Sequence, residues 1–190
     1  LYIALFSIVG QMFISSLAAY SFAKINFKGK QVVFMLFLSS MMVPSQLTII
    51  PRFMLFKTIG LYNNLWAIIL PAFFGATSIF MLRQFYMGLP NDLIEAAKID
   101  GAGHLRIFLR IMLPLTKAAL MSLIILAFIS SWNEYMAPLI FLVKKELYTV
   151  SQNIQWYMLD EFKEHNLTMA AATSAIVPVV ILFIVGQKYF

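Results

Sequence analysis

One polar segment stands out among long apolar runs, the segment from Glu95 to Gly103 (EAAKIDGAG). Glu95 and Lys98 carry opposite charges at a spacing that brings them together on a helix face. Gly101 and Gly103 are suited to ending such a helix, and Pro114 ends or kinks the next one. These residue types are suited to binding another protein and not to catalysis. The pattern therefore predicts a rigid, bent loop to which a soluble partner protein binds.

The sequence lacks the motifs of common catalytic and metal sites. No G-x-x-x-x-G-K-[ST] loop is present, because the only Gly-Lys pair, Gly29-Lys30, has no upstream glycine at the required position. No H-E-x-x-H or G-x-S-x-G pattern occurs, and the absence of Cys removes thiolate ligands and cysteine nucleophiles. We expect no metal site, no cofactor and no enzymatic activity in this chain. ATP hydrolysis, where needed, is expected from a separate subunit.

Composition indicates a membrane protein. The chain is 62% hydrophobic and 12% charged, with a mean hydropathy of +0.85, whereas soluble domains are roughly 45–50% apolar and about 25% charged. A soluble fold of this size would have too little polar surface to cover such a core. The net charge of +6 would indicate nucleic acid in a soluble protein. Here the positive-inside bias of membrane proteins explains it better, and no nucleic-acid partner is expected.

The predicted spans are the gaps between charges. A spanning helix needs about 20 mostly apolar residues. Five gaps are candidates: residues 1–23, 31–51, 58–82, 118–133 and 166–187. The fourth gap is short, but the chain stays apolar past Glu134, so its outer end is expected to be broken or re-entrant. The predicted fold class is an all-α polytopic membrane helical bundle with five transmembrane helices.

Basic residues set the expected orientation. When the loops alternate across the membrane, nine basic residues fall on one side and five on the other, which makes the first side cytoplasmic. The loop 83–117 that contains Glu95 lies on the cytoplasmic side in this topology. His104 and His165 fall on opposite sides, so they cannot form one site and are expected to be solvated. Residue 1 would lie outside, so we expect an N-terminal truncation, with about six helices in the full protein.

Local signals describe the loop 83–117 further. Asp92 and Glu95 form a capping-box-like pair after Pro90. A second short helix is expected at about 104–113, with Arg106 and Arg110 on one face. By physics alone, an amphipathic connector touching anionic lipid explains this loop equally well.

A family resemblance favours a loop that binds a soluble partner over a connector on the lipid surface. Glu95-Ala96-Ala97, Gly101 four residues after the second alanine, and the run Ile111 to Pro114 resemble the EAA loop of binding-protein-dependent ABC importer permeases. Other segments resemble the carbohydrate branch of that family, closest to the second permease subunit of maltose- and glycerol-3-phosphate-type systems: 20–24, 27–30, 59–64, 106–108, 132–133, 138–139, 169–172 and 187–190. One departure is Lys117-Ala118, where the family often has a proline.

The resemblance implies the mechanism and the partners. The chain would be a single transmembrane permease domain (1–190) that moves a sugar or sugar-like solute into a prokaryotic cell by alternating access in the inner or plasma membrane. Its loop would dock on cytoplasmic ATPase subunits, with Glu95 as polar anchor, Ala96 and Ala97 packing closely, and Asp100 and Gly101 fixing the turn. Simple helix capping is the alternative role for Glu95. The other implied partners are a second permease subunit, an extracytoplasmic solute-binding protein and membrane lipid.

Polar residues in the spans are candidates for the solute path, because such groups are costly in lipid. We expect Gln11, Trp132 and Asn133 to contribute, since amides and aromatic rings suit sugar binding. The alternatives are interfacial aromatic residues and helix-packing contacts. In the external segment 144–166, the acidic residues Asp160, Glu161 and Glu164 are expected to contact the binding protein, with a solvated linker as the alternative.

Two other functions remain open from the residues alone. An ion-gradient-driven secondary carrier would need a coupling site such as buried acids. No Asp or Glu falls in the first, second, third or last predicted span, which counts against proton coupling. A non-transporting membrane assembly subunit would need neither a polar path nor the Glu95 loop.

Overall fold

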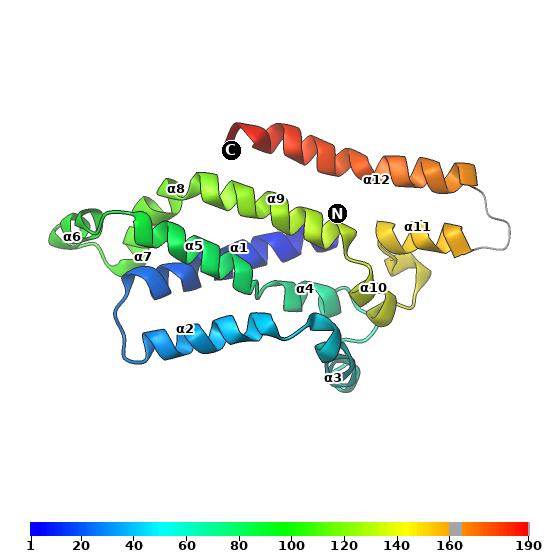
Figure 1. The fold of residues 1–190 in the computed structure, drawn as a ribbon, viewed down its shortest axis with the longest axis horizontal. Helices are drawn as coiled ribbons and strands as arrows, with labels where there is room; N and C mark the ends of the chain where they lie inside the picture. Colours follow the sequence, from blue (N-terminus) through cyan, green and yellow to red (C-terminus); the bar gives the residue numbers. More distant parts are fainter. Residues whose placement is uncertain (160–164, 190) are drawn as a thin grey trace.

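The computed structural model describes residues 1–159 and 165–189, and these residues form helices and no strands. Most of the longer helices run approximately along one long axis, and α3 crosses it (Figure 1). Their bounds are α1 Tyr2–Lys24, α2 Lys30–Ser39, α3 Ser45–Thr58, α4 Trp66–Ala72, α5 Ala76–Gly88, α6 Asp92–Ile99, α7 His104–Ile107, α8 Leu113–Leu115, α9 Lys117–Asn133, α10 Met136–Phe141, α11 Val150–Leu159 and α12 His165–Gly186. A π-helical turn, η2 (Phe108–Met112), joins α7 to α8, and 3₁₀ turns occupy η1 (Ser40–Met42), η3 (Lys145–Leu147) and η4 (Gln187–Tyr189). The predicted all-helical class is confirmed.

Three stretches in the described residues are long and apolar enough to cross a membrane: Tyr2–Lys24, Trp66–Gly88 and His165–Gly186. Two bent pairs bring the number to five if each counts as one span, α2–η1 with α3 and α7–α8 with α9. The predicted number of five is therefore an upper limit of what the helices allow.

The gap 31–51 is not the single straight span expected from its lack of charge. The helical segments before and after Val43 and Pro44 meet at 97°. Pro44 explains the break, because its ring disfavours helical geometry in Val43, which is extended at φ −85° and ψ 113°. Helix α3 consequently crosses the direction of the other helices (Figure 1).

Helix α1 is the centre of the bundle. It packs against α4, α5 and α9, and its buried side chains are mostly small or slender, including Ala4, Ser15, Ser16 and Ala19. Small residues allow helices to approach closely in a membrane, where lipid is as apolar as the core. Gly10 is one such position, since a Cβ there would collide with the ring of Phe73.

The helix is interrupted at two places within or at the end of the predicted spans. The third span is interrupted at Phe73–Gly75, between α4 and α5, where Gly75 is extended at φ −95° and ψ 96°. The fourth ends at Asn133, and Glu134 turns the chain into α10. The second break matches the expected interruption beyond the short fourth gap.

Helix α12 lies along the outside of the bundle, beside α9 and α11 (Figure 1). Only 6% of its most apolar window is buried. Helix α11 occupies part of the predicted external segment. The predicted binding-protein contacts Asp160, Glu161 and Glu164 lie outside the described residues.

Candidate functional site

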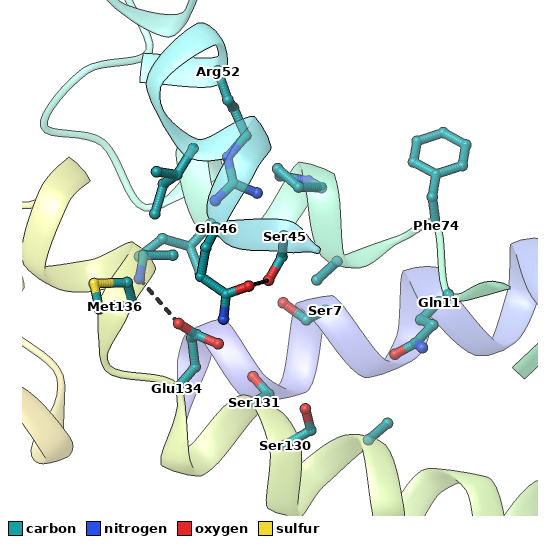
Figure 2. A pocket seen from close by; sticks show the side chains of 17 residues that line it. Ser7, Gln11, Ser45, Gln46, Arg52, Phe74, Ser130, Ser131, Glu134 and Met136 are labelled. Atoms are coloured by element: carbon teal, nitrogen blue, oxygen red, sulfur yellow. Dashed lines mark hydrogen bonds between the residues drawn. The ribbon is translucent and has the colours of Figure 1, made fainter. Parts of the chain in front are cut away.

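A polar pocket of about 400 Å³ lies where α1, α3, the α4–α5 break and the end of α9 meet. Its charged and polar lining residues are Ser7, Gln11, Ser45, Gln46, Arg52, Ser130, Ser131 and Glu134. Figure 2 shows Arg52 on one side, Glu134 and the two α9 serines on the other, and Gln46 between them in this view. Because polar side chains are costly in lipid, their convergence indicates a hydrated or solute-binding space.

Arg52 enters the pocket from α3. Its guanidinium carbon lies 5.1 Å from the centroid of the Phe141 ring, a cation–π arrangement. The Nε–H group is buried and has no hydrogen-bond partner among the described residues. An unsatisfied buried donor of this kind costs about 1–3 kcal/mol.

Glu134 occupies the break between α9 and α10. One carboxylate oxygen, Oε1, accepts a hydrogen bond of 3.0 Å from the backbone N–H of Ala137, in the first turn of α10. A carboxylate offers about four acceptor sites on its two oxygens. The capping contact therefore leaves further acceptor capacity facing the polar pocket.

Gln11 lines the polar pocket, and its part in the solute path stays a prediction. Its Nε2 donates to the Oγ of Ser78 at 3.1 Å. The amide passes so close to Gly75 that any side chain there would collide with it. Ser7, one turn before Gln11 on α1, is 2% exposed, and its Oγ has no partner among the described residues.

Trp132 and Asn133 do not share this pocket. The Trp132 indole lines a neighbouring cavity of about 210 Å³, stacks on Phe128 with centroids 5.5 Å apart, and donates from Nε1 to the Ala175 carbonyl at 2.9 Å. These contacts give it a role in joining α9 to α12. Asn133 is exposed and is not a lining residue of either cavity. Their part in the solute path stays a prediction.

The sequence reasoning missed Ser45, Gln46 and Arg52. Ser45 and Gln46 lie within the predicted span 31–51, and Arg52 follows it directly. The bend after Pro44 is what brings them to the pocket. Pro44 within an uncharged gap is the signal that would have found them.

Helix α6 lies at the end of the bundle away from α10 and α11 (Figure 1) and contains the predicted coupling residues Glu95, Ala96 and Ala97. Asp100 and Gly101 follow it. Gly101 has a left-handed φ of +77°, as expected for the residue that ends the helix. The N–H of Gly101 donates to Lys98 O at 3.0 Å, and the N–H of Ala102 donates to Ala97 O at 2.9 Å. This pair of bonds is the Schellman motif, which satisfies the last carbonyls and fixes the turn.

The two faces of α6 differ in exposure. Ile94 (5% exposed) and Ala97 (8% exposed) are buried in the main apolar core, so Ala97 packs within its own chain. Glu95 and Ala96 are exposed, as are Asp100 and Gly101. Ile99 is 87% exposed, although it is a large apolar side chain. The outward face therefore combines a carboxylate, a small residue and an uncovered isoleucine.

The start of α6 differs from the expected capping box. Asn91 is the N-cap residue, and no side chain caps the helix there. The Asn91 Oδ1 instead accepts a hydrogen bond of 2.7 Å from the Lys24 ammonium, which also donates to the Leu89 carbonyl at 2.6 Å. Lys24 thus ties the entrance of α6 to the end of α1.

His104 is not the solvated loop residue that the sequence indicated. It is half-buried, and its Nδ1 shares a hydrogen bond of 3.0 Å with the Tyr20 hydroxyl. Tyr20 is 2% exposed and packs edge-on against Tyr86, with ring centroids 6.1 Å apart. The segment after α6 is therefore attached to α1, as is the segment before it. After Pro114 the chain bends by 77° into α9.

Replacing Lys24 with Met is expected to loosen α6 and lower transport about tenfold at unchanged membrane insertion. The reason is that two hydrogen bonds to a charged group are lost, each worth about 1.5–3 kcal/mol. Faster amide hydrogen exchange in α6, measured beside uptake, would check this. Lys28→Met, which removes an exposed charge from the turn after α1, is the control and should behave like the wild type.

Comparison with known proteins identifies relatives along the whole chain. The family model described as "Binding-protein-dependent transport system inner membrane component" matches residues 11–190. The arabinooligosaccharides transport system permease protein AraQ of Bacillus subtilis (strain 168) is 36% identical over 190 residues, which cover 100% of this chain and 68% of AraQ. The sn-glycerol-3-phosphate transport system permease protein UgpE of Yersinia pestis is 32% identical over 184 residues, which cover 96% of this chain and 66% of UgpE.

A solved structure agrees with these relatives. A chain in the crystal structure of a bacterial ABC transporter involved in the import of the acidic polysaccharide alginate has a TM-score of 0.88 and 25% sequence identity. The match covers 100% of this chain and 72% of that chain. The expected resemblance to importer permeases is confirmed. The chain belongs to the family of binding-protein-dependent transport system inner membrane components.

Proposed function

We propose that the chain is one of two permease subunits of an ATP-driven importer in a prokaryotic inner or plasma membrane, and that it moves a sugar or sugar-like solute into the cell. Family membership over residues 11–190 carries the proposal. AraQ and UgpE are named for transport of a carbohydrate and of a sugar-like phosphate ester, which supports the solute class. The polar pocket, lined by Gln11, Arg52 and Glu134, supports a solute path, which an assembly subunit would not need.

Helix α6 is the proposed contact with a separate cytoplasmic ATPase. Its exposed face, with Glu95, Ala96 and Ile99, has the mixture of polar and apolar groups that a protein groove recognises. Its buried face and the contacts of Lys24 and Tyr20 fix it to the bundle. A helix held in this way transmits a movement of the ATPase subunit to α1, whereas a flexible loop would not. An extracytoplasmic solute-binding protein, contacted by Asp160, Glu161 and Glu164, would deliver the solute.

Site-directed cross-linking tests this function, because residues 1–190 contain no Cys that would compete with an introduced one. A single Cys at Ala96 in the full-length protein is expected to cross-link to the ATPase subunit of the same membrane, with a yield that changes on ATP addition. Ala97→Cys is the matched control and should not cross-link, since Ala97 is buried within its own chain.

The competing functions predict other results. If neither Ala96→Cys nor Ile99→Cys reaches an ATPase in well-inserted protein, the loop is a lipid-surface connector. Uptake that continues without ATP and stops when ion gradients are dissipated would instead support a secondary carrier.

A further inference from the structure

Three basic residues gather where α1, α2 and α5 meet, at the end of the bundle that carries α6 (Figure 1). Lys24 is the last residue of α1, Lys30 is the first residue of α2, and Arg83 lies near the end of α5. Each of these helices belongs to a candidate membrane span. The three charges, here called the basic cluster, therefore lie at the level where the spans end and lipid headgroups begin.

The basic cluster is bound to backbone carbonyls and not to acids. Arg83 Nε donates to the Phe22 carbonyl at 3.3 Å, and Lys30 Nζ donates to the Ala23 carbonyl at 3.3 Å. These carbonyls belong to the last turn of α1, where a helix leaves its acceptors unpaired. Lys30 repels the charges of both Lys24 and Arg83. None of the three forms an ion pair with an acid in the part of the chain that the structure describes.

The positive charge of the basic cluster exceeds what the fold uses. Three full charges face the end of a helix, whose dipole is equivalent to about half of one negative charge. Arg83 uses only its Nε–H, and Lys30 uses a single N–H. Their other N–H groups reach the surface, since the buried side-chain polar atoms without a partner among the described residues belong to Ser7, Ser15 and Arg52. Guanidinium and ammonium groups at this distance from each other suit the oxygens of a phosphate.

Apolar groups surround the basic cluster where it faces the membrane. The guanidinium carbon of Arg83 lies 4.1 Å from the centroid of the buried Phe34 ring, so the ring supports the charge from below. The opposite face of α2 is apolar and uncovered, with Val32 58%, Met35 53% and Leu36 66% exposed. A soluble anion would contact the charges alone. A phospholipid would contact the charges with its phosphate and this face with an acyl chain.

We propose that the basic cluster binds the headgroup of an anionic glycerophospholipid, such as phosphatidylglycerol, with one acyl chain along the exposed face of α2. Arg83 and Lys30 donate to the phosphate oxygens. Lys24 adds its charge while it holds the entrance of α6, so the lipid relieves the repulsion among the three cations beside that attachment. In the predicted topology this end of the bundle is cytoplasmic, where basic groups meet anionic lipid. The inference does not depend on which solute the protein moves.

Photo-cross-linking in nanodiscs tests the proposal. The full-length chain would be assembled with its partner permease and the ATPase in phosphatidylcholine nanodiscs that contain a small fraction of a probe lipid. The two probes are phosphatidylglycerol and phosphatidylcholine, each with the same diazirine in the acyl chain. Mass spectrometry measures the cross-linked fraction of residues 31–39. The wild type is expected to give at least fivefold more cross-linking with the phosphatidylglycerol probe.

Three variants separate a built site from general surface charge. Lys30→Gln combined with Arg83→Gln should reduce the preference to about twofold or less. Lys30→Gln alone should remove at least half of it, and this single variant retains the Arg83 contacts with Phe22 and Phe34 if the double variant does not fold. Lys28→Gln removes an exposed charge from the turn between α1 and α2 and should keep the wild-type preference.

Equal cross-linking of the two probes to the wild type would overturn the proposal. A loss in Lys28→Gln as large as in Lys30→Gln would also overturn it, because the membrane would then respond to net charge and not to this cluster. Inorganic phosphate, added at constant ionic strength, should leave the preference unchanged. If phosphate abolished the preference, the cluster would be a site for soluble phosphate and not for a lipid.

Discussion

Replacing Ile99 with Asp is expected to reduce ATP-driven uptake by about 30-fold or more, while the protein still folds and inserts. Ile99 is 87% exposed, so its side chain contributes almost nothing to the stability of its own chain. We expect Ile99 to lie at the centre of the contact with the ATPase, where the few residues that dominate an interface each contribute about 2 kcal/mol or more, and about 1.4 kcal/mol corresponds to a factor of ten. Uptake and ATP hydrolysis by the reconstituted transporter would measure the loss.

The opposite face of the same helix provides the control. Ile94→Asp places a carboxylate in the apolar core, where Ile94 is 5% exposed, and should destabilise the protein by more than about 3 kcal/mol. It should therefore lower the amount of folded protein, whereas Ile99→Asp should lower only coupling. Normal uptake in Ile99→Asp would show that no partner covers this face of α6.

Gly10→Val is expected to disrupt the packing of the bundle. A Cβ at Gly10 would occupy the space of the Phe73 ring, at the point where α1 meets the α4–α5 break. Overpacking of this kind typically costs about 1–3 kcal/mol, and a branched side chain on a central helix should reach the upper end of that range. A lower thermal unfolding midpoint in detergent, with less protein in the membrane, is the expected measurement.

Gly88→Ala is the matched control for this substitution. Gly88 is the last residue of α5, and a Cβ there meets no atom within 4 Å. The change in stability should stay within about 0.5 kcal/mol. If Gly10→Val were equally harmless, the close approach of α1 and Phe73 would not contribute to stability.

Several features follow from the sequence by itself. The lack of charge over long stretches required apolar helices, because lipid leaves backbone groups no partner except one another. Gly101 marked the end of α6, since only glycine takes a left-handed turn without a steric penalty. Gln11 was singled out as a polar group that is costly in lipid, and it lines the polar pocket, while its part in the solute path stays a prediction. These are local properties, decided by the chemistry of each residue and its near neighbours.

Other features depend on contacts between distant segments. Arg52 entered the polar pocket only because the chain bends at Pro44, and hydropathy does not distinguish a bent apolar run from a straight one. Ala97 proved to face its own core, and His104 to bond to Tyr20, 84 residues earlier in the chain. Periodicity indicates which residues share a helix face but not what covers that face. The tertiary structure alone decided that α6 turns Ala97 inward and leaves Ile99 outward, because only the burial of one face in the apolar core determines the rotation of so short a helix.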